Sequence, residues 1–307
     1  MKRKICIALI LTVIAVPITI YFAAPGLVYR ATISVERCRS GLAAKSVMVG
    51  DHRIAYLEGG SGPVVLLIHG FSGEKDHWTR FAKRLTPSYR VVIPDLPGFG
   101  ESTRSWTAKY GILDQVARLA GFMEALKLGP AHLAGNSMGG NVAGALAARR
   151  PELVKSLALF DSSGVTPPKK SEMQLAWDRG VNLLLVNDAD DYDRVMKLNF
   201  SKPIWLPGPM KRYFAEKAAA ARPFNRKVET DRRAETYDLG PSLGLIRART
   251  LILWGGDDRI LDKSAVALFE RGIRNHVTVI MEQCGHTPML ERPDEAAGHY
   301  LDFLETI

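Results

Sequence analysis

Cysteine is nearly absent from this chain of 307 residues, which contains only three. Three cysteines do not build a disulfide framework. Cys6 lies in an apolar N-terminal run, and a Cys38–Cys284 bridge in an oxidising compartment is the one pairing that stays open. H-E-x-x-H, C-x-x-C and P-loop patterns are also missing, and the G-G-S-G run at 59–62 is typical of a turn. We therefore expect no metal and no cofactor.

Acidic residues are fewer than basic ones, 32 against 41, so the formal net charge is +9. Nucleic-acid binding would need a basic patch on a recognised binding module, and no such module is present. The excess of lysine and arginine is therefore either a solvated surface or an attraction to anionic lipid head groups. The sequence shows no internal repeat and no low-complexity tract, which indicates one core domain.

Charge is absent from residues 5–24, and these follow the basic residues 2–4. Twenty helical residues span about 30 Å, the thickness of a bilayer core. We expect residues 1–24 to be a retained signal anchor and residues 25–45 to be a tether. The positive-inside rule then places the catalytic domain on the non-cytoplasmic side, which is the periplasm in a two-membrane bacterium. The alternative is a cleaved signal and a secreted protein.

Apolar runs alternate with helix-like segments along the rest of the chain, which predicts an α/β fold with a mostly parallel sheet covered by helices on both faces. One helix is expected over 112–126. The expected strands open with a hairpin about Gly50-Asp51 and lie at 46–49, 52–58, 64–68, 91–93, 131–134, 156–160, 250–254 and 277–281.

About ninety residues separate Phe160 from Thr250, which is far more than one crossover needs. We expect residues 165–238 to form a helical cap, inserted between core segments 46–164 and 239–307. Helix-like patterns within this insertion cover 172–185, 192–198 and 210–221.

The chemistry is indicated by Gly135-Asn136-Ser137-Met138-Gly139, which joins an apolar strand to an alanine-rich helix. In that context the G-x-S-x-G pattern places a nucleophilic serine on a sharp, strained turn. The two glycines are needed because the strand and the helix pass close together there. Ser137 is therefore the candidate nucleophile.

Three further loops supply partners for Ser137. A His69-Gly70 turn follows the apolar run 64–68, and in this context the main-chain N–H groups of Phe71 and Met138 are the expected oxyanion donors. The run 251–254 ends in a loop with acidic residues, and 277–281 is followed by His286. The chain order serine, acid, histidine is the order that α/β-hydrolases use.

Taken together, these stretches resemble the α/β-hydrolase superfamily, and most of all the family V bacterial lipases and the membrane-anchored α/β-hydrolase-domain monoacylglycerol lipases. The resemblance covers roughly 47–303 and implies an eight-stranded sheet of that fold. It places the triad acid at Asp258, with Asp257 and Asp161 as the other candidates. The matching stretches are HGFSGEKDHWTRFAKRL, DLPGFGEST, HLAGNSMGGNVAG, SLALFDSSGV, LILWGGDDRILD and MEQCGHTPMLERP.

We expect a serine carboxylic-ester hydrolase in which Ser137 is the nucleophile, His286 the base and Asp258 the acid. The substrate would be a small acyl ester or a lipid, with monoacylglycerols or medium-chain acyl esters favoured by the expected membrane anchor. Two alternatives stay open. One is a carbon–carbon bond hydrolase of the meta-cleavage type, and the other is a catalytically inactive α/β-hydrolase that serves as a binding module.

Overall fold

The computed structural model describes residues 17, 19, 21–235 and 237–307. Its centre is a single eight-stranded sheet with the strand order β1-β2-β4-β3-β5-β6-β7-β8. β2 pairs antiparallel with both β1 and β4, and all the other neighbours are parallel. The strands are β1 Leu42–Val49, β2 His52–Gly59, β3 Val64–Ile68, β4 Arg90–Pro94, β5 Ala131–Asn136, β6 Val154–Phe160, β7 Arg249–Gly255 and β8 His276–Met281.

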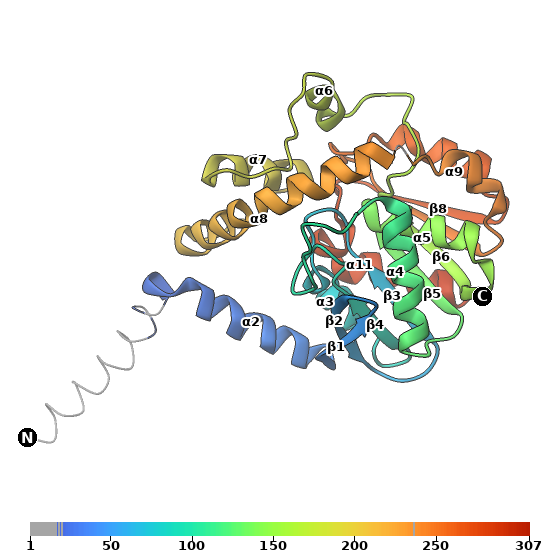
Figure 1. The fold of residues 1–307 in the computed structure, drawn as a ribbon, viewed down its shortest axis with the longest axis horizontal. Helices are drawn as coiled ribbons and strands as arrows, with labels where there is room; N and C mark the ends of the chain where they lie inside the picture. Colours follow the sequence, from blue (N-terminus) through green and yellow to red (C-terminus); the bar gives the residue numbers. More distant parts are fainter. Residues whose placement is uncertain (1–16, 18, 20, 236) are drawn as a thin grey trace, which may run out of the picture.

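Helices cover both faces of this sheet because its central strands are apolar on both sides (Figure 1). In β3, Leu66 and Ile68 belong to one core cluster, whereas Val65 and Leu67 belong to another on the opposite face. The first cluster includes buried residues of α4 Ile112–Ala125, α5 Met138–Arg149 and α9 Val266–Gly272, and the second includes residues of α3 Thr79–Ala82, α10 Pro288–Glu291 and α11 Pro293–Leu304.

The prediction of an α/β fold with a mostly parallel sheet is confirmed, and every expected strand is present. The opening hairpin turns at Gly50, whose φ of 57° is accessible to glycine, and Val49 faces His52 across it. β1 begins at Leu42, four residues before the predicted start at Ser46.

The segment 25–45, which we expect to be a tether, has regular secondary structure. It contains the helix α2 Pro25–Arg39 and the first residues of β1. Proline at the first position favours a helix start, and Arg37 and Arg39 complement the dipole at its end. The Arg37 guanidinium also donates to both carboxylate oxygens of Asp76, at 2.7 and 2.6 Å, which fixes the helix against the core.

Most of the predicted membrane span, residues 5–24, lies outside the described residues. Within the described part of the chain, no helix is both long enough and apolar enough to cross a membrane.

The segment predicted as a cap contains α6 Glu172–Asp178, α7 Ala189–Asn199 and α8 Gly208–Glu235, which lie together on one side of the molecule (Figure 1). The prediction of a helix up to residue 185 was wrong for residues 179–185. α6 ends at Asp178 because Gly180, with φ 79°, adopts the left-handed conformation that terminates helices.

Helix α8 is far longer than the predicted 210–221, because it continues through Pro223 to Glu235. An internal proline costs a helix about 3 kcal/mol. Phe224 and Val228, which follow it, are only 5 % and 0 % exposed and belong to the main core cluster. Burying two such side chains stabilises the fold by about 1.5–3 kcal/mol each, which is enough to offset the cost of the proline.

Candidate active site

Ser137 sits between β5 and α5 in a strained conformation, with φ 55° and ψ −118°. Few non-glycine residues adopt this backbone, and such strain is typical of functional sites. A Cβ atom on Gly135 would lie 2.2 Å from the carbonyl oxygen of Gly139, and one on Gly139 would lie 2.4 Å from that of Ile68. Both positions therefore require glycine, and the predicted strand–turn–helix around Ser137 is present.

His286 and Asp258 come together from the loops after β8 and β7. His286 Nδ1 lies 2.8 Å from Asp258 Oδ2, and both side chains are almost completely buried. The other Asp258 oxygen accepts main-chain N–H groups of Ile260 at 2.7 Å and Leu261 at 3.0 Å. These bonds fix the carboxylate so that it accepts from the imidazole.

The histidine loop is held next to the nucleophile turn. Asn136, the residue before Ser137, donates from Nδ2 to the main-chain carbonyl of His286 at 2.9 Å. Among the hydrogen bonds of the described residues, none joins Ser137 Oγ to the His286 ring. Such bonds are often loose in enzymes without substrate, so the arrangement remains compatible with general-base catalysis.

The two expected oxyanion donors flank Ser137. A Cβ atom on Gly70 would approach the Ser137 Cβ to 3.1 Å, so the loop that carries Phe71 lies directly against the nucleophile. Met138 begins α5, and its N–H therefore has no partner within the helix. Across the described ranges, neither the Phe71 nor the Met138 N–H donates to a protein acceptor. Both are thus available to an anionic oxygen.

His69 has a structural role in the same loop. Its ring accepts the Leu96 N–H at Nε2 and contacts the Gly70 carbonyl through Nδ1, so both nitrogens are occupied. Burial lowers the pKa of His69 to about 4, which keeps the ring neutral. His69 is therefore not a second base.

The two other candidate acids have different environments. Asp257 is exposed and accepts a hydrogen bond from Ser201 Oγ at 2.5 Å. Asp161, directly after β6, is completely buried and lies close to Asp258 and His286. Burial, followed by the charge of Asp258, raises the pKa of the Asp161 carboxyl well above its usual range. The pairing with His286 favours Asp258 as the triad acid.

Two supporting residues escaped the sequence analysis, namely Asn136 and Glu291. Glu291, in α10, accepts the N–H groups of Gly285 at 2.7 Å, Ser201 at 3.2 Å and Lys202 at 3.0 Å, which ties the histidine loop to the segment after α7. A side chain whose partners are main-chain groups leaves no recognisable pattern in the sequence, because those groups are the same in every residue. For Asn136, the only signal was its position inside the G-x-S-x-G segment.

Cys284, beside the histidine loop, is buried, and Cys38 is exposed; both are free thiols, so the Cys38–Cys284 bridge that stayed open is not formed. Burial raises the pKa of the Cys284 thiol well above its usual range. The thiol therefore stays protonated and is a poor nucleophile.

Helix α8 contacts the loop that carries Phe71. Asn225 Nδ2 donates to Ser72 Oγ at 2.9 Å, and Lys217 Nζ bonds both oxygens of Glu74 at 2.8 and 2.9 Å. Glu74 also accepts from Tyr29 of α2 at 2.8 Å. The loop is thus connected to α8 and to the N-terminal helix at the same carboxylate.

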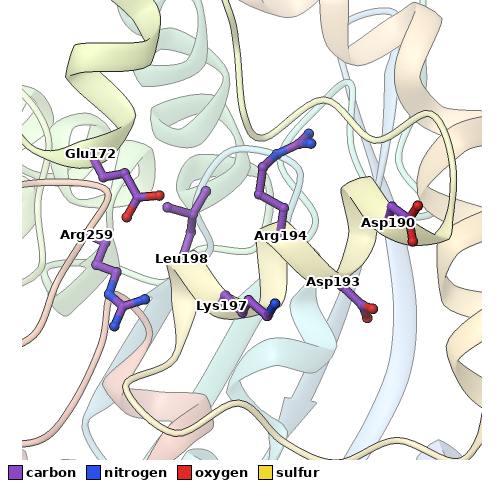
Figure 2. A pocket seen from close by; sticks show the side chains of 7 residues that line it. All are labelled: Glu172, Asp190, Asp193, Arg194, Lys197, Leu198 and Arg259. Atoms are coloured by element: carbon purple, nitrogen blue, oxygen red, sulfur yellow. The ribbon is translucent and has the colours of Figure 1, made fainter.

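A cavity of about 320 Å³ is lined mostly by side chains of α7, and Figure 2 shows these residues. Arg259, the residue after Asp258, faces it, but Ser137 and His286 do not line it. Its charged lining does not suit an acyl chain. The lining residues are Glu172, Asp190, Asp193, Arg194, Lys197, Leu198 and Arg259.

Comparison with known proteins agrees with this geometry. Residues 63–293 match the family described as alpha/beta hydrolase fold. The chain is 35% identical to Lipase 1 of Psychrobacter immobilis, covering 88% of this chain and 87% of that protein. It is 30% identical to the monoacylglycerol lipase ABHD6 of Rattus norvegicus, with 96% and 93% covered. A crystal structure of a membrane phospholipase A, titled a bacterial virulence factor, matches with a TM-score of 0.91 and 44% identity, covering 100% of this chain and 99% of the other. From the fold, the serine turn and these relatives together, the chain belongs to the α/β-hydrolase family.

Proposed function

We propose that this protein hydrolyses carboxylic esters of glycerolipids through an acyl-enzyme on Ser137. The observation that carries the proposal is the buried His286–Asp258 hydrogen bond of 2.8 Å. It is accompanied by the strained backbone of Ser137 and by two main-chain N–H groups, those of Phe71 and Met138, that have no protein acceptor among the described residues. The named lipase relatives support carboxylic-ester hydrolysis and do not favour the carbon–carbon hydrolase or the inactive binding module.

In this mechanism His286 takes the Ser137 proton as the oxygen attacks the ester carbonyl. Asp258 keeps the imidazole in the tautomer with the proton on Nδ1 and stabilises the imidazolium that forms. The Phe71 and Met138 N–H groups donate to the oxyanion, and loss of one such donor costs about 3 kcal/mol of barrier. His286 then protonates the leaving alcohol, and water releases the acid by the reverse sequence of proton transfers.

The substrate class follows from the relatives and from the N-terminal sequence. One relative is named a monoacylglycerol lipase and another a membrane phospholipase A, and both classes of substrate are acyl esters of glycerol. The uncharged run at 5–24 is long enough to anchor the enzyme where such lipids reside. We infer a membrane-anchored enzyme whose α6–α8 segment covers the acyl site.

The test compares hydrolysis of monoacylglycerols, phospholipids and p-nitrophenyl esters of increasing chain length by the full chain and by Ser137→Ala. We expect maximal rates at C8 or longer, and a loss of about 10⁴-fold or more in kcat for the variant. An acetate optimum would replace the lipase assignment by that of a general esterase. Turnover retained by Ser137→Ala, or activity limited to a vinylogous diketone, would overturn the proposal.

A further inference from the structure

A second buried carboxyl group lies beside the His286–Asp258 pair. Asp161 is fully buried, and one of its carboxyl oxygens, one carboxyl oxygen of Asp258 and one ring nitrogen of His286 all lie within 4.8 Å of one another. Its φ of 43° is unusual for a residue other than glycine. The carboxyl group therefore lies on a left-handed turn directly after β6.

Three of the four carboxyl oxygens of Asp161 and Asp258 have a hydrogen-bond partner. Asp161 Oδ1 accepts the Gly255 N–H at 2.8 Å, whereas Oδ2 is buried and has no partner among the described residues. On Asp258, Oδ1 accepts two main-chain N–H groups and Oδ2 accepts His286 Nδ1. A carboxylate has about four acceptor positions, so one on Asp258 Oδ2 is still open.

The charges around Asp161 disfavour a second ionised carboxylate. Asp258 faces it from the β7 loop and Glu291 from α10, and both are acidic; Cys284, from the β8 loop, carries a thiol that burial keeps neutral. His286 is the remaining titratable group, and as a general base it must be neutral at rest. In the described part of the chain, no lysine or arginine forms an ion pair with Asp161 or Asp258.

We propose that Asp161 is a positioning residue, which keeps a proton on Oδ2 and donates it as a hydrogen bond to Asp258. The pair then carries one negative charge, and every oxygen in it has a partner. Burial and the neighbouring charge of Asp258 raise the pKa of Asp161, as this arrangement needs. The inference rests on the proposed function, because it describes what supports the triad acid.

During the reaction no bond at Asp161 breaks. When the Ser137 proton moves to His286 Nε2, the imidazolium faces a singly charged pair, and the Asp161 proton stays on Oδ2. The hydrogen bond that Asp161 donates draws part of the negative charge of Asp258 toward Asp161. The attraction between the Asp258 carboxylate and the imidazolium is therefore weaker than that of an isolated carboxylate. The same hydrogen bond also holds Asp258 Oδ2 in line with Nδ1.

The first test measures kcat and KM against pH for the wild type, Asp161→Leu and Asp161→Asn. Leucine removes the donor, and we expect kcat to fall about 10- to 100-fold with KM changed less than about 2-fold. Asparagine still accepts the Gly255 N–H and donates from Nδ2 to Asp258, so it should recover most of the lost kcat.

The acid limb of the asparagine profile distinguishes the two charge states of Asp161. If Asp161 is neutral, the limb moves by less than about 0.3 pH units. If Asp161 is ionised, removing a charge within 4.8 Å of the imidazole moves the limb down by about 2 pH units, which would overturn the proposal. Asp257→Asn is the matched control. Asp257 is adjacent in sequence to Asp258 but is exposed, so the acid limb of this variant's pH profile should not move.

A second measurement needs neither turnover nor the leucine variant. Infrared difference spectra of wild type and Asp161→Asn at pH 8 should show the C=O band of a protonated carboxylic acid in the wild type alone. Absence of that band overturns the proposal even if Ser137→Ala is inactive. Conversely, if the band is present but Ser137→Ala is still active, the proposed function is overturned, whereas the proposal that Asp161 is protonated stands.

Discussion

Replacing Gly139 by alanine tests the close approach that creates the serine turn. The added Cβ would lie 2.4 Å from the carbonyl oxygen of Ile68 and 2.5 Å from that of His69. Both atoms are main chain, so relief requires α5 to move away from β3 by roughly 1 Å, since carbon and oxygen normally stay about 3.4 Å apart. Overpacking of this kind typically costs about 1–3 kcal/mol.

The matched control is Gly298→Ala in α11, where nothing lies within 4 Å of the added carbon. Alanine is favoured over glycine inside a helix by about 1 kcal/mol. The same chemical change should therefore stabilise one helix and destabilise the other.

The assay is thermal and urea unfolding of both variants, followed by kcat. Gly298→Ala should raise Tm by about 2–4 °C, and Gly139→Ala should lower Tm by that amount or more. Gly139→Ala should also lower kcat by about 10²-fold, because a shift of α5 displaces the Met138 N–H. A Gly139→Ala protein as stable and as active as the wild type would refute the steric account of the turn.

Two further predictions concern groups away from the serine. Burial raises the pKa of the Glu74 carboxyl, but Lys217 and the other neighbouring groups lower it by more, so that the pKa in the folded protein is about 2. The stabilisation that Glu74 provides is therefore complete above its unfolded pKa of about 4.5 and is lost as the pH falls towards 2. Glu74→Gln should therefore flatten the pH dependence of the unfolding free energy between about pH 4.5 and 2, and an unchanged slope in acid titrations would contradict this contact. Iodoacetamide should label Cys38 in the native protein but Cys284 only after unfolding; equal labelling rates by peptide mass spectrometry would show that the Cys284 site opens to solvent.

The serine turn could be predicted from the sequence, because the turn requires glycine at fixed neighbouring positions for steric reasons. Gly135 and Gly139 are needed wherever strand and helix pass this closely, and the contacts of both glycines bear that out. The strands were also predictable, since continuous apolar runs such as Val64–Ile68 are typical of buried parallel strands.

Tertiary contacts determined what the sequence could not show. Asp161 and Asp258 come together because β6 and β7 are neighbours, with Phe160 opposite Leu253, and no local pattern reports that register. The length of α8 depends on Phe224 and Val228 entering the core after Pro223, whose local preference points the other way. Helix α2 likewise owes its place to Arg37, whose partner Asp76 lies 39 residues away.

The role of Ser137 as the nucleophile is tested by the mass of the protein after reaction with a fluorophosphonate, followed by peptide mapping. We expect one covalent adduct, located on Ser137 and formed much more slowly in His286→Ala. An adduct on another residue, or labelling of Ser137 at the same rate without the imidazole, would contradict this role.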